Sequence, residues 1–262
     1  SHPVIDLHTH LVPGVDDGAR TLEQAREALE RLAADGVRTV ACTPHLRASE
    51  VRRGMVPDHG AAFATLAAAV PAGVTLRRGW EVMLDDPGVA LDDPALALAG
   101  TRVVLVELPR GEVPPGADRE LARIRSSGVI PLVAHPERYG GMTPALARRW
   151  HDAGALLQAD ATTLCGTGTR GTRARALLAD GAYDVIASDN HGDVRSPRVA
   201  ADWLAARGAA DVATLLTETN PARLLGGEAP LPVPAVRAPE GVAQLRAWLV
   251  ARLRGARPDR RP

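Results

Sequence analysis

Short apolar runs alternate along the chain with longer amphipathic segments. The runs cover residues 4–7, 37–42, 74–76, 103–108, 129–134, 155–158 and 185–187. Several are rich in valine and isoleucine, which is typical of strands that are buried on both faces of a sheet. About seven strand–helix units of this kind predict an α/β fold, either a parallel barrel or a doubly wound sheet, and periodicity alone does not choose between them.

The segments between the apolar runs carry helix boundaries. Thr21 and Gln24 have the spacing of a capping box, and the apolar face that follows predicts a helix that ends before Gly36. Thr143 followed by Pro144 predicts the start of another helix, which we expect to end near residue 154.

The composition changes after Gly227, where "EAPLPVPAVRAPEG" has the proline content of a linker. A short amphipathic helix is expected from about Val242 to Arg252, followed by a basic end. We therefore predict one domain over residues 1–226 and a Pro/Arg-rich C-terminal extension over residues 227–262.

Composition excludes several classes of protein. The 31 basic and 31 acidic residues cancel, so no net field attracts nucleic acid or a membrane surface. Aromatic residues make up only 3% of the chain, which argues against a binder that stacks bases. No apolar run approaches the ~18 residues of a membrane-spanning helix, and no signal peptide is visible. With only two cysteines, a cytoplasmic protein without membrane insertion is expected.

Five of the eight histidines stand at or just beyond the ends of predicted strands. They are His8, His10, His45, His135 and His191. In a parallel barrel, functional groups gather at the carboxyl ends of the strands, so residues that are distant in sequence would face one cavity. His8 and His10 point to the same face because the side-chain period of a strand is two. A lone histidine is usually structural, but this constellation predicts a metal site.

Carboxylates occupy equivalent places. Glu81, Glu107 and Asp189 stand near strand ends, and the Asp16–Asp17 pair follows the first strand. Imidazoles and carboxylates without thiolates suit manganese, iron or zinc. The candidate ligands are too numerous for one ion, so two or three divalent ions with a bridging carboxylate are expected. Such clusters activate water and neutralise the oxygens of a group that is being hydrolysed.

Six short motifs occur in the order typical of the polymerase-and-histidinol-phosphatase (PHP) superfamily. They are "DLHTH", "TPH" at 43–45, "GWEV" at 79–82, "VELP" at 106–109, "HPERY" at 135–139 and "SDNH" at 188–191. The segments "VPGVDDG" and "HPERY" resemble one branch, the bacterial CpsB/CapC-type manganese-dependent protein-tyrosine phosphatases linked to capsule and exopolysaccharide synthesis. The resemblance covers about residues 4–226.

This resemblance implies a distorted (β/α)7 TIM-like barrel with a trinuclear site at the C-terminal ends of the strands. It assigns the ligands to three ions, with Mn²⁺ as the expected metal and Glu81 bridging two of them. The three groups are His8, His10, Glu81 and Asp189; Glu81, Glu107 and His135; and one aspartate of the Asp16–Asp17 pair with His45 and His191. Asp17 is the favoured member of the pair, but the sequence does not settle the choice.

The resemblance also implies hydrolysis of phosphotyrosine on protein, with the tail of a bacterial tyrosine autokinase as the partner. Arg138 matches the phosphate-binding arginine of "HPERY", and Arg195 is a second candidate. Both fit the chemistry, because a guanidinium binds phosphate as a planar fork. A homo-oligomer is compatible with the sequence, which does not decide it.

The sequence argues against several other functions. Cysteine-dependent phosphatases need Cys-x5-Arg, but Ala48 lies six residues after Cys42 and Gly171 lies six after Cys165. An amidohydrolase would need a metal-bridging lysine, and the chain has none. A non-catalytic metal-binding protein fits poorly because the ligand set is complete. The remaining alternative is a small-molecule phosphatase of the same superfamily that acts on histidinol phosphate or a nucleotide.

The loop after His45 departs from the family pattern, because it lacks a second histidine that often follows "TPH". Its arginines, Arg47, Arg52 and Arg53, could meet an acidic substrate tail or form ordinary surface.

Overall fold

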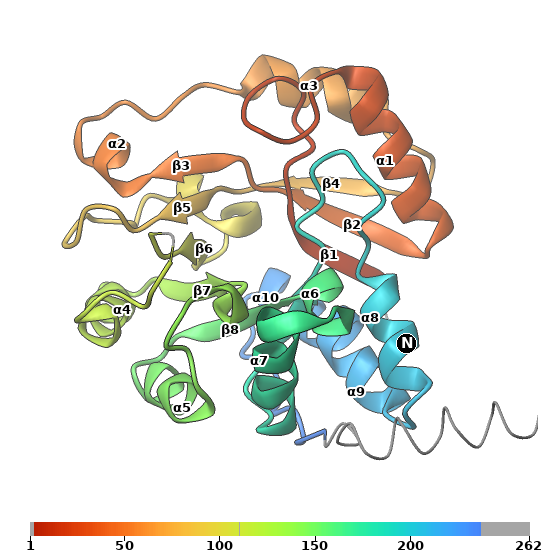
Figure 1. Ribbon diagram of the computed structural model, residues 1–262. Helices are drawn as coiled ribbons and strands as arrows, with labels where there is room; N and C mark the ends of the chain where they lie inside the picture. Colours follow the sequence, from red (N-terminus) through yellow and green to blue (C-terminus); the bar gives the residue numbers. More distant parts are fainter. Residues whose placement is uncertain (1–2, 110, 237–262) are drawn as a thin grey trace, which may run out of the picture.

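The computed structural model describes residues 3–109 and 111–236, which contain two parallel sheets (Figure 1). The strands are β1 (Val4–Thr9), β2 (Val37–Cys42), β3 (His45–Arg47), β4 (Thr75–Arg78), β5 (Glu81–Met83), β6 (Val103–Glu107), β7 (Ile130–Ala134), β8 (Leu156–Asp160) and β9 (Val185–Ala187). One sheet has the order β1-β2-β4, and the other has the order β3-β5-β6-β7-β8-β9. The fold is therefore α/β with parallel strands, as predicted.

In two places one strand follows another in the chain after a break of two residues. The chain passes from β2 to β3 through Thr43 and Pro44, and from β4 to β5 through Gly79 and Trp80. The two breaks lie side by side, because the Gly79 N–H donates to the Cys42 carbonyl at 3.1 Å. A Cβ at position 79 would lie 2.7 Å from a Leu98 methyl carbon, so a larger residue there would require the Leu98 side chain to shift.

His45 and Glu81 lie just beyond the ends of β2 and β4, as predicted, but two further short strands that begin at these residues were not predicted. The apolar pattern did not reveal these strands, β3 and β5. Strands of three residues are too short to produce a recognisable alternation. The two residues are register partners in the parallel pair β3–β5, which places them next to each other.

Helices lie outside the strands, and most follow a strand in the chain (Figure 1). The α-helices are α1 (Leu22–Ala34), α2 (Ala48–Arg52), α3 (Gly60–Ala68), α4 (Ala117–Ser126), α5 (Pro144–Asp152), α6 (Ala161–Cys165), α7 (Gly168–Ala179), α8 (Arg198–Ala205), α9 (Ala210–Thr214) and α10 (Asn220–Leu225). The shorter helical segments are η1 (Pro94–Leu96), η2 (Leu98–Gly100), η3 (Pro136–Arg138) and the π-helix η4 (Leu215–Thr219).

Both predicted helix starts are confirmed. The hydroxyl of Thr21 accepts a hydrogen bond from the Gln24 N–H at 3.2 Å, and the hydroxyl of Thr143 accepts one from the Leu146 N–H at 3.2 Å. The reciprocal bond of the first cap differs from a standard capping box, because the Gln24 side chain accepts from the Arg20 N–H at 2.9 Å. These caps fix where α1 and α5 begin.

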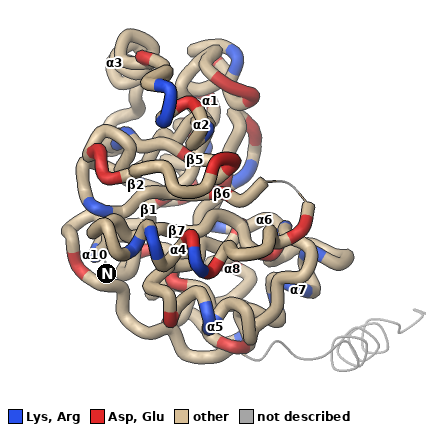
Figure 2. Tube along the Cα trace, turned by 90° about the vertical axis from the view of Figure 1, so that its left-hand side faces the viewer, with Lys and Arg blue, Asp and Glu red and all other residues tan. Residues whose placement is uncertain are grey.

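Strands β1, β6, β7, β8 and β9 are buried on both faces, as their composition predicted, whereas β4 is largely exposed. In β6, Val104 and Val106 pack into one apolar cluster with the surrounding helices, while Val103 and Leu105 pack into another with residues of β1 and β7. The alternation follows from the two-residue period of a strand. Acidic and basic residues are interspersed along the trace rather than segregated by sign (Figure 2).

Leu231 and Val236, in the segment predicted as a C-terminal extension, contact the preceding part of the chain. The amide of Asn220 makes two hydrogen bonds with the backbone of Leu231, at 2.8 and 2.9 Å, and the Val236 N–H donates to the Leu178 carbonyl at 3.3 Å. The helix expected from about Val242 to Arg252 lies outside the described residues. Within those described, no helix has the length and apolar character needed to cross a membrane.

Candidate metal centre

The end of β1 supplies two histidines that meet two carboxylates. The Nε2 atoms of His8 and His10 lie 3.1 Å apart. Each approaches the same Glu81 Oε2, at 3.1 and 3.2 Å, and the same Asp189 Oδ1, at 3.2 Å in both cases. All four residues are buried. This is the first group that the family resemblance implied, and its ligand atoms surround a common point.

A contact at the Nδ1 atom orients each of these two imidazole rings. The Nδ1 atom of His8 lies 2.9 Å from the Gln158 Oε1, and the Nδ1 atom of His10 lies 2.7 Å from the Asp16 Oδ2. A partner at one ring nitrogen fixes the tautomer and directs the lone pair of the other nitrogen toward a metal. The Nε2 atoms of both rings are therefore directed into the cluster.

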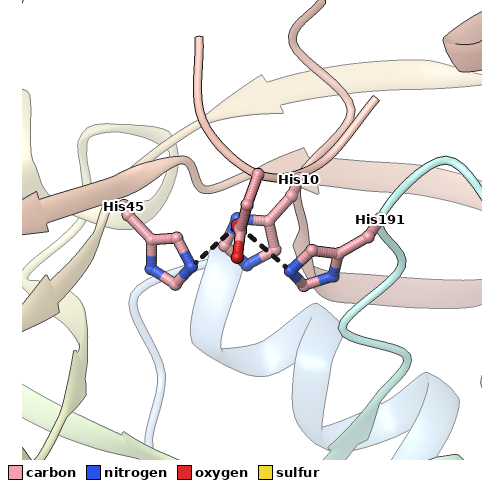
Figure 3. Close-up of side chains that lie close together, drawn as sticks. His10, His45 and His191 are labelled. Carbon is pink, nitrogen blue, oxygen red and sulfur yellow. Dashed lines mark ion pairs between the residues drawn. The ribbon is translucent and has the colours of Figure 1, made fainter. Parts of the chain in front are cut away.

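The two neighbouring aspartates have different surroundings. Asp16 faces inward and contacts His10, whereas the Asp17 Oδ1 lies 3.2 Å from the His45 Nε2 and 3.4 Å from the His191 Nε2. Figure 3 shows the rings of His45 and His191 on either side of His10. The His10 and His191 rings are stacked with their centroids 4.2 Å apart. Asp17 therefore contacts His45 and His191, the two histidines that the resemblance placed with one of the two aspartates.

Glu81 occupies the centre of the site, since its two oxygens contact four histidines in all. Besides the contacts of Oε2 with His8 and His10, Oε2 lies 3.1 Å from the His45 Nδ1, and Oε1 lies 2.9 Å from the His135 Nε2. A carboxylate in this position has the geometry of a bridging ligand.

The remaining group differs from the one that the resemblance implied. Ligand atoms of His45, Glu81 and Glu107 lie close together, with the Glu107 Oε1 3.5 Å from the His45 Nδ1. His135 is adjacent to this group through Glu81 but is not part of its tightest set. All nine predicted ligand residues thus belong to one continuous cluster, with His45 between two groups.

Backbone strain is concentrated at this cluster. His135 (φ 34°) and Asp189 (φ 52°) adopt left-handed backbone conformations, and Ala99 is the one other non-glycine residue of the described chain that does so. Such conformations cost about 1–3 kcal/mol each and persist where the surroundings impose them. Both residues immediately follow strands or strand-end segments, so the strain directs their side chains into the site.

The electrostatics and the donor set fit divalent cations. Burial acts to raise the pKa of Glu81, but the surrounding histidines hold that pKa well below its usual range. Burial and the nearby His10 lower the pKa of His191, which keeps its ring neutral and able to donate a lone pair.

Four buried atoms of the cluster make no hydrogen bond: the His45 Nδ1, Glu81 Oε2, Glu107 Oε1 and His135 Nδ1. Buried polar atoms without partners are costly, and cation binding would satisfy those that face the cluster.

The cluster opens onto a cavity of about 370 Å³ that also contains three arginines. Arg138 donates to Asp160 and, at 2.6 Å, to the Asp189 Oδ2. Arg195 lies farther away, with its Nη1 3.5 Å from the same Asp189 oxygen. The structure thus brings both predicted phosphate-binding arginines to the cluster. Arg170, from α7, lines the cavity and was not predicted.

Sequence reasoning missed Gln158 and Asp160, which orient His8 and Arg138. Both lie in β8, two residues apart and near its carboxyl end. His8 and His10 have the same two-residue spacing at the end of a strand, so this pattern could have identified Gln158 and Asp160 as well. Arg52 and Arg53 are turned to other partners, Asp86 and the Ser49 carbonyl.

The chain is similar to known proteins in sequence and in fold. The tyrosine-protein phosphatase CpsB of Streptococcus pneumoniae is 26% identical to the chain over 238 residues, which cover 85% of this chain and 98% of CpsB. A structure described as "Crystal structures of YwqE from Bacillus subtilis and CpsB from Streptococcus pneumoniae, unique metal-dependent tyrosine phosphatases" matches with a TM-score of 0.72 at 24% identity, covering 89% of this chain and 100% of that one. A mutant organophosphorus hydrolase from Deinococcus radiodurans has a similar fold, with a TM-score of 0.54 at 15% identity, covering 86% and 93% of the two chains.

The family described as "Capsular polysaccharide synthesis, CpsB/CapC" matches residues 4–226, which include all nine residues of the cluster. The chain belongs to the CpsB/CapC family.

Proposed function

We propose that the protein is a metal-dependent phosphatase that hydrolyses phosphotyrosine on protein. The observation that carries this proposal is the placement of Arg138 and Arg195 beside Asp189, at the edge of a buried histidine–carboxylate cluster that opens onto one cavity. Its relatives in the family are named tyrosine-protein phosphatases, which supports the same reaction.

The cluster would hold two or three divalent ions, with Mn²⁺ as the most plausible metal. The nitrogen and oxygen donors, without thiolate, suit manganese, iron or zinc. We propose that His8, His10, Glu81 and Asp189 would hold one ion, and that Asp17, His45 and His191 would hold another. Glu81 and Glu107 would hold a third together with His135, as the resemblance assigned, and His45 lies close to the same two carboxylates. When bound, such ions activate water and neutralise charge on the phosphoryl oxygens.

The arginines would bind the phosphoryl group. Arg138 is held by Asp160 on one side, which leaves its planar guanidinium directed at the Asp189 edge of the cluster. A guanidinium at this position can bind two phosphoryl oxygens and keep phosphorus in line with the attacking water. The Arg195 Nη2 lies 2.8 Å from the Asp193 Oδ2. Arg195 would bind the same phosphoryl group from the segment between β9 and α8.

Other side chains near the cavity have structural roles. The hydroxyl of Tyr139 donates to the Ala134 carbonyl at 3.1 Å and accepts from the Leu108 N–H at 3.0 Å, so it links the end of β7 to the residue after β6 and does not act as an acid. Burial raises the pKa of Cys42 to about 12 and that of Cys165 to about 11, which removes both thiols as nucleophiles. Phenolate is a fair leaving group, so tyrosine phosphate needs little help from a general acid.

The biological substrate we propose is the tail of a bacterial tyrosine kinase that regulates capsule or exopolysaccharide synthesis in the cytoplasm. We further propose that residues 1–226 form a distorted (β/α)7 barrel that carries the catalysis, with the extension beyond residue 226 as an accessory. Three features support a seven-strand barrel: β2 leads directly into β3, β4 leads directly into β5, and a bridge joins Thr9 at the end of β1 to Asn190 after β9.

The decisive experiment is a phosphatase assay on manganese-loaded protein that compares a phosphotyrosine peptide with histidinol phosphate. Preference for the peptide is the expected result. Preference for histidinol phosphate would keep the metal chemistry and replace the function with that of a small-molecule phosphatase. His8→Ala and His10→Ala serve as controls, because each should abolish turnover while the protein remains folded.

A further inference from the structure

Helix α7 contributes three arginines, and only two of them have structural roles. Arg173 donates to the Glu137 carbonyl at 2.7 Å, and Arg175 donates to the Gly166 carbonyl at 2.7 Å. Arg170 is exposed and forms no ion pair or hydrogen bond with any described residue, yet it lines the cavity that contains the cluster. We propose that Arg170 is a specificity residue that pairs with a carboxylate next to the phosphotyrosine of the substrate, an inference that rests on the proposed phosphatase function.

The backbone that carries Arg170 is firmly placed. A side chain at Gly171 would lie 2.3 Å from the Gly166 carbonyl oxygen, so the first turn of α7 packs directly against the end of α6. The bond from Arg175 to the same carbonyl closes this junction. A rigid base reduces the entropy that is lost when a long side chain binds a partner, which favours use of Arg170 in recognition.

The position of Arg170 separates it from the phosphate-binding pair. Arg138 and Arg195 both contact Asp189, a member of the cluster, whereas Arg170 contacts no member of it. Arg170 lines the cavity but forms no ion pair with the cluster, so its guanidinium is free to meet a part of the substrate beyond the phosphoryl group. For a protein substrate, that part is a side chain adjacent to the phosphotyrosine, and the positive charge selects an acidic one.

Two matched phosphotyrosine peptides test this assignment, one with glutamates flanking the phosphotyrosine and one with glutamines. The substrate p-nitrophenyl phosphate, which has no flanking residues, reports on the cluster alone. In Arg170→Ala, we expect kcat/KM for the glutamate peptide to fall about three- to fivefold, through KM, as for an exposed ion pair. Turnover of the glutamine peptide and of p-nitrophenyl phosphate should not change.

Arg170→Glu should reverse the preference between the two peptides, and the wild-type preference should weaken as salt is raised. A binding measurement complements the kinetics: fluorescence anisotropy of labelled peptides with a non-hydrolysable phosphonate should show the same loss of affinity in Arg170→Ala. Arg102→Ala is the matched control, since Arg102 is also exposed and unpaired among the described residues but lies before β6, at the opposite end of the strand from the cluster.

The outcomes separate two failures. If wild-type protein does not hydrolyse either peptide, the proposed function fails. If it hydrolyses both but Arg170→Ala leaves their ratio unchanged, or lowers p-nitrophenyl phosphate turnover equally, the specificity assignment is wrong and, in the second case, Arg170 acts on the phosphate itself.

Discussion

Substituting Asp16 should mainly lower the stability of the fold, whereas substituting Asp17 should mainly lower the metal content. The Asp16 carboxylate accepts hydrogen bonds from the His10 Nδ1 at 2.7 Å, the Gly18 N–H at 3.0 Å and the His45 N–H at 3.2 Å, and its side chain is only 6% exposed. The Asp17 side chain is 60% exposed and contacts only the two histidines of its group.

The magnitudes follow from these contacts. Hydrogen bonds to a charged group contribute about 1.5–3 kcal/mol each, and water can replace part of the loss, so Asp16→Ala should lower the free energy of unfolding by about 3 kcal/mol. Asp17→Ala removes no buried hydrogen bond and should change that free energy by less than about 0.5 kcal/mol. It should instead lose one ion, because it removes a ligand atom from the third group.

Chemical denaturation in the presence of a chelator measures the first effect without a contribution from bound metal. Metal analysis of the reconstituted proteins measures the second. Asp17→Ala is the control for Asp16→Ala, since the two residues are adjacent and carry the same charge. Equal destabilisation by the two substitutions, or a larger effect from Asp17→Ala, would refute the assignment of Asp16 as the residue that orients His10.

The same carboxylate gives a pH dependence with a defined sign. Burial acts to raise the pKa of Asp16, but the hydrogen bonds from His10 and the backbone bring it from an ordinary 3.8 to about 2. A folded-state pKa below the unfolded value stabilises the protein above the unfolded value, and this contribution is lost as the pH falls through the folded one. The difference in stability between wild type and Asp16→Ala should therefore be complete above about pH 4 and shrink toward pH 2.

Three further predictions concern the cluster and its chemistry. Gly18→Ala would place a carbon 2.0 Å from the His10 carbonyl oxygen, so it should destabilise the fold by about 1–3 kcal/mol and reduce metal content; a normal metal content would show that the loop can shift. Arg138→Ala should retain its ions but lose about 10²–10³ in kcat/KM, and unchanged kinetics would make Arg138 structural. Chelators should inhibit, whereas iodoacetamide should not, because burial keeps the Cys42 and Cys165 thiols protonated; inhibition by the alkylating agent would contradict the metal mechanism.

Much of the site could be predicted from the sequence, because residue types that bind metal ions occur at the ends of predicted strands. The i, i+2 pair of His8, in β1, and His10, just after it, needed only the period of a strand, and Asp189 and His191 after β9 needed the rule that parallel strands end at one edge. The helix caps at Thr21 and Thr143 were equally local, since each involves residues three apart.

Only the tertiary structure decided how those residues share their atoms. Sequence could not distinguish Asp16 from Asp17, because the choice depends on a bond to His10 and on the position of His45 after another strand. It placed His45 and Glu81 just after strands, which is confirmed, but it did not predict that both also begin strands too short to show a period. Periodicity reports which face of an element is buried; which oxygen meets which nitrogen depends on distances between elements, and these are set by packing.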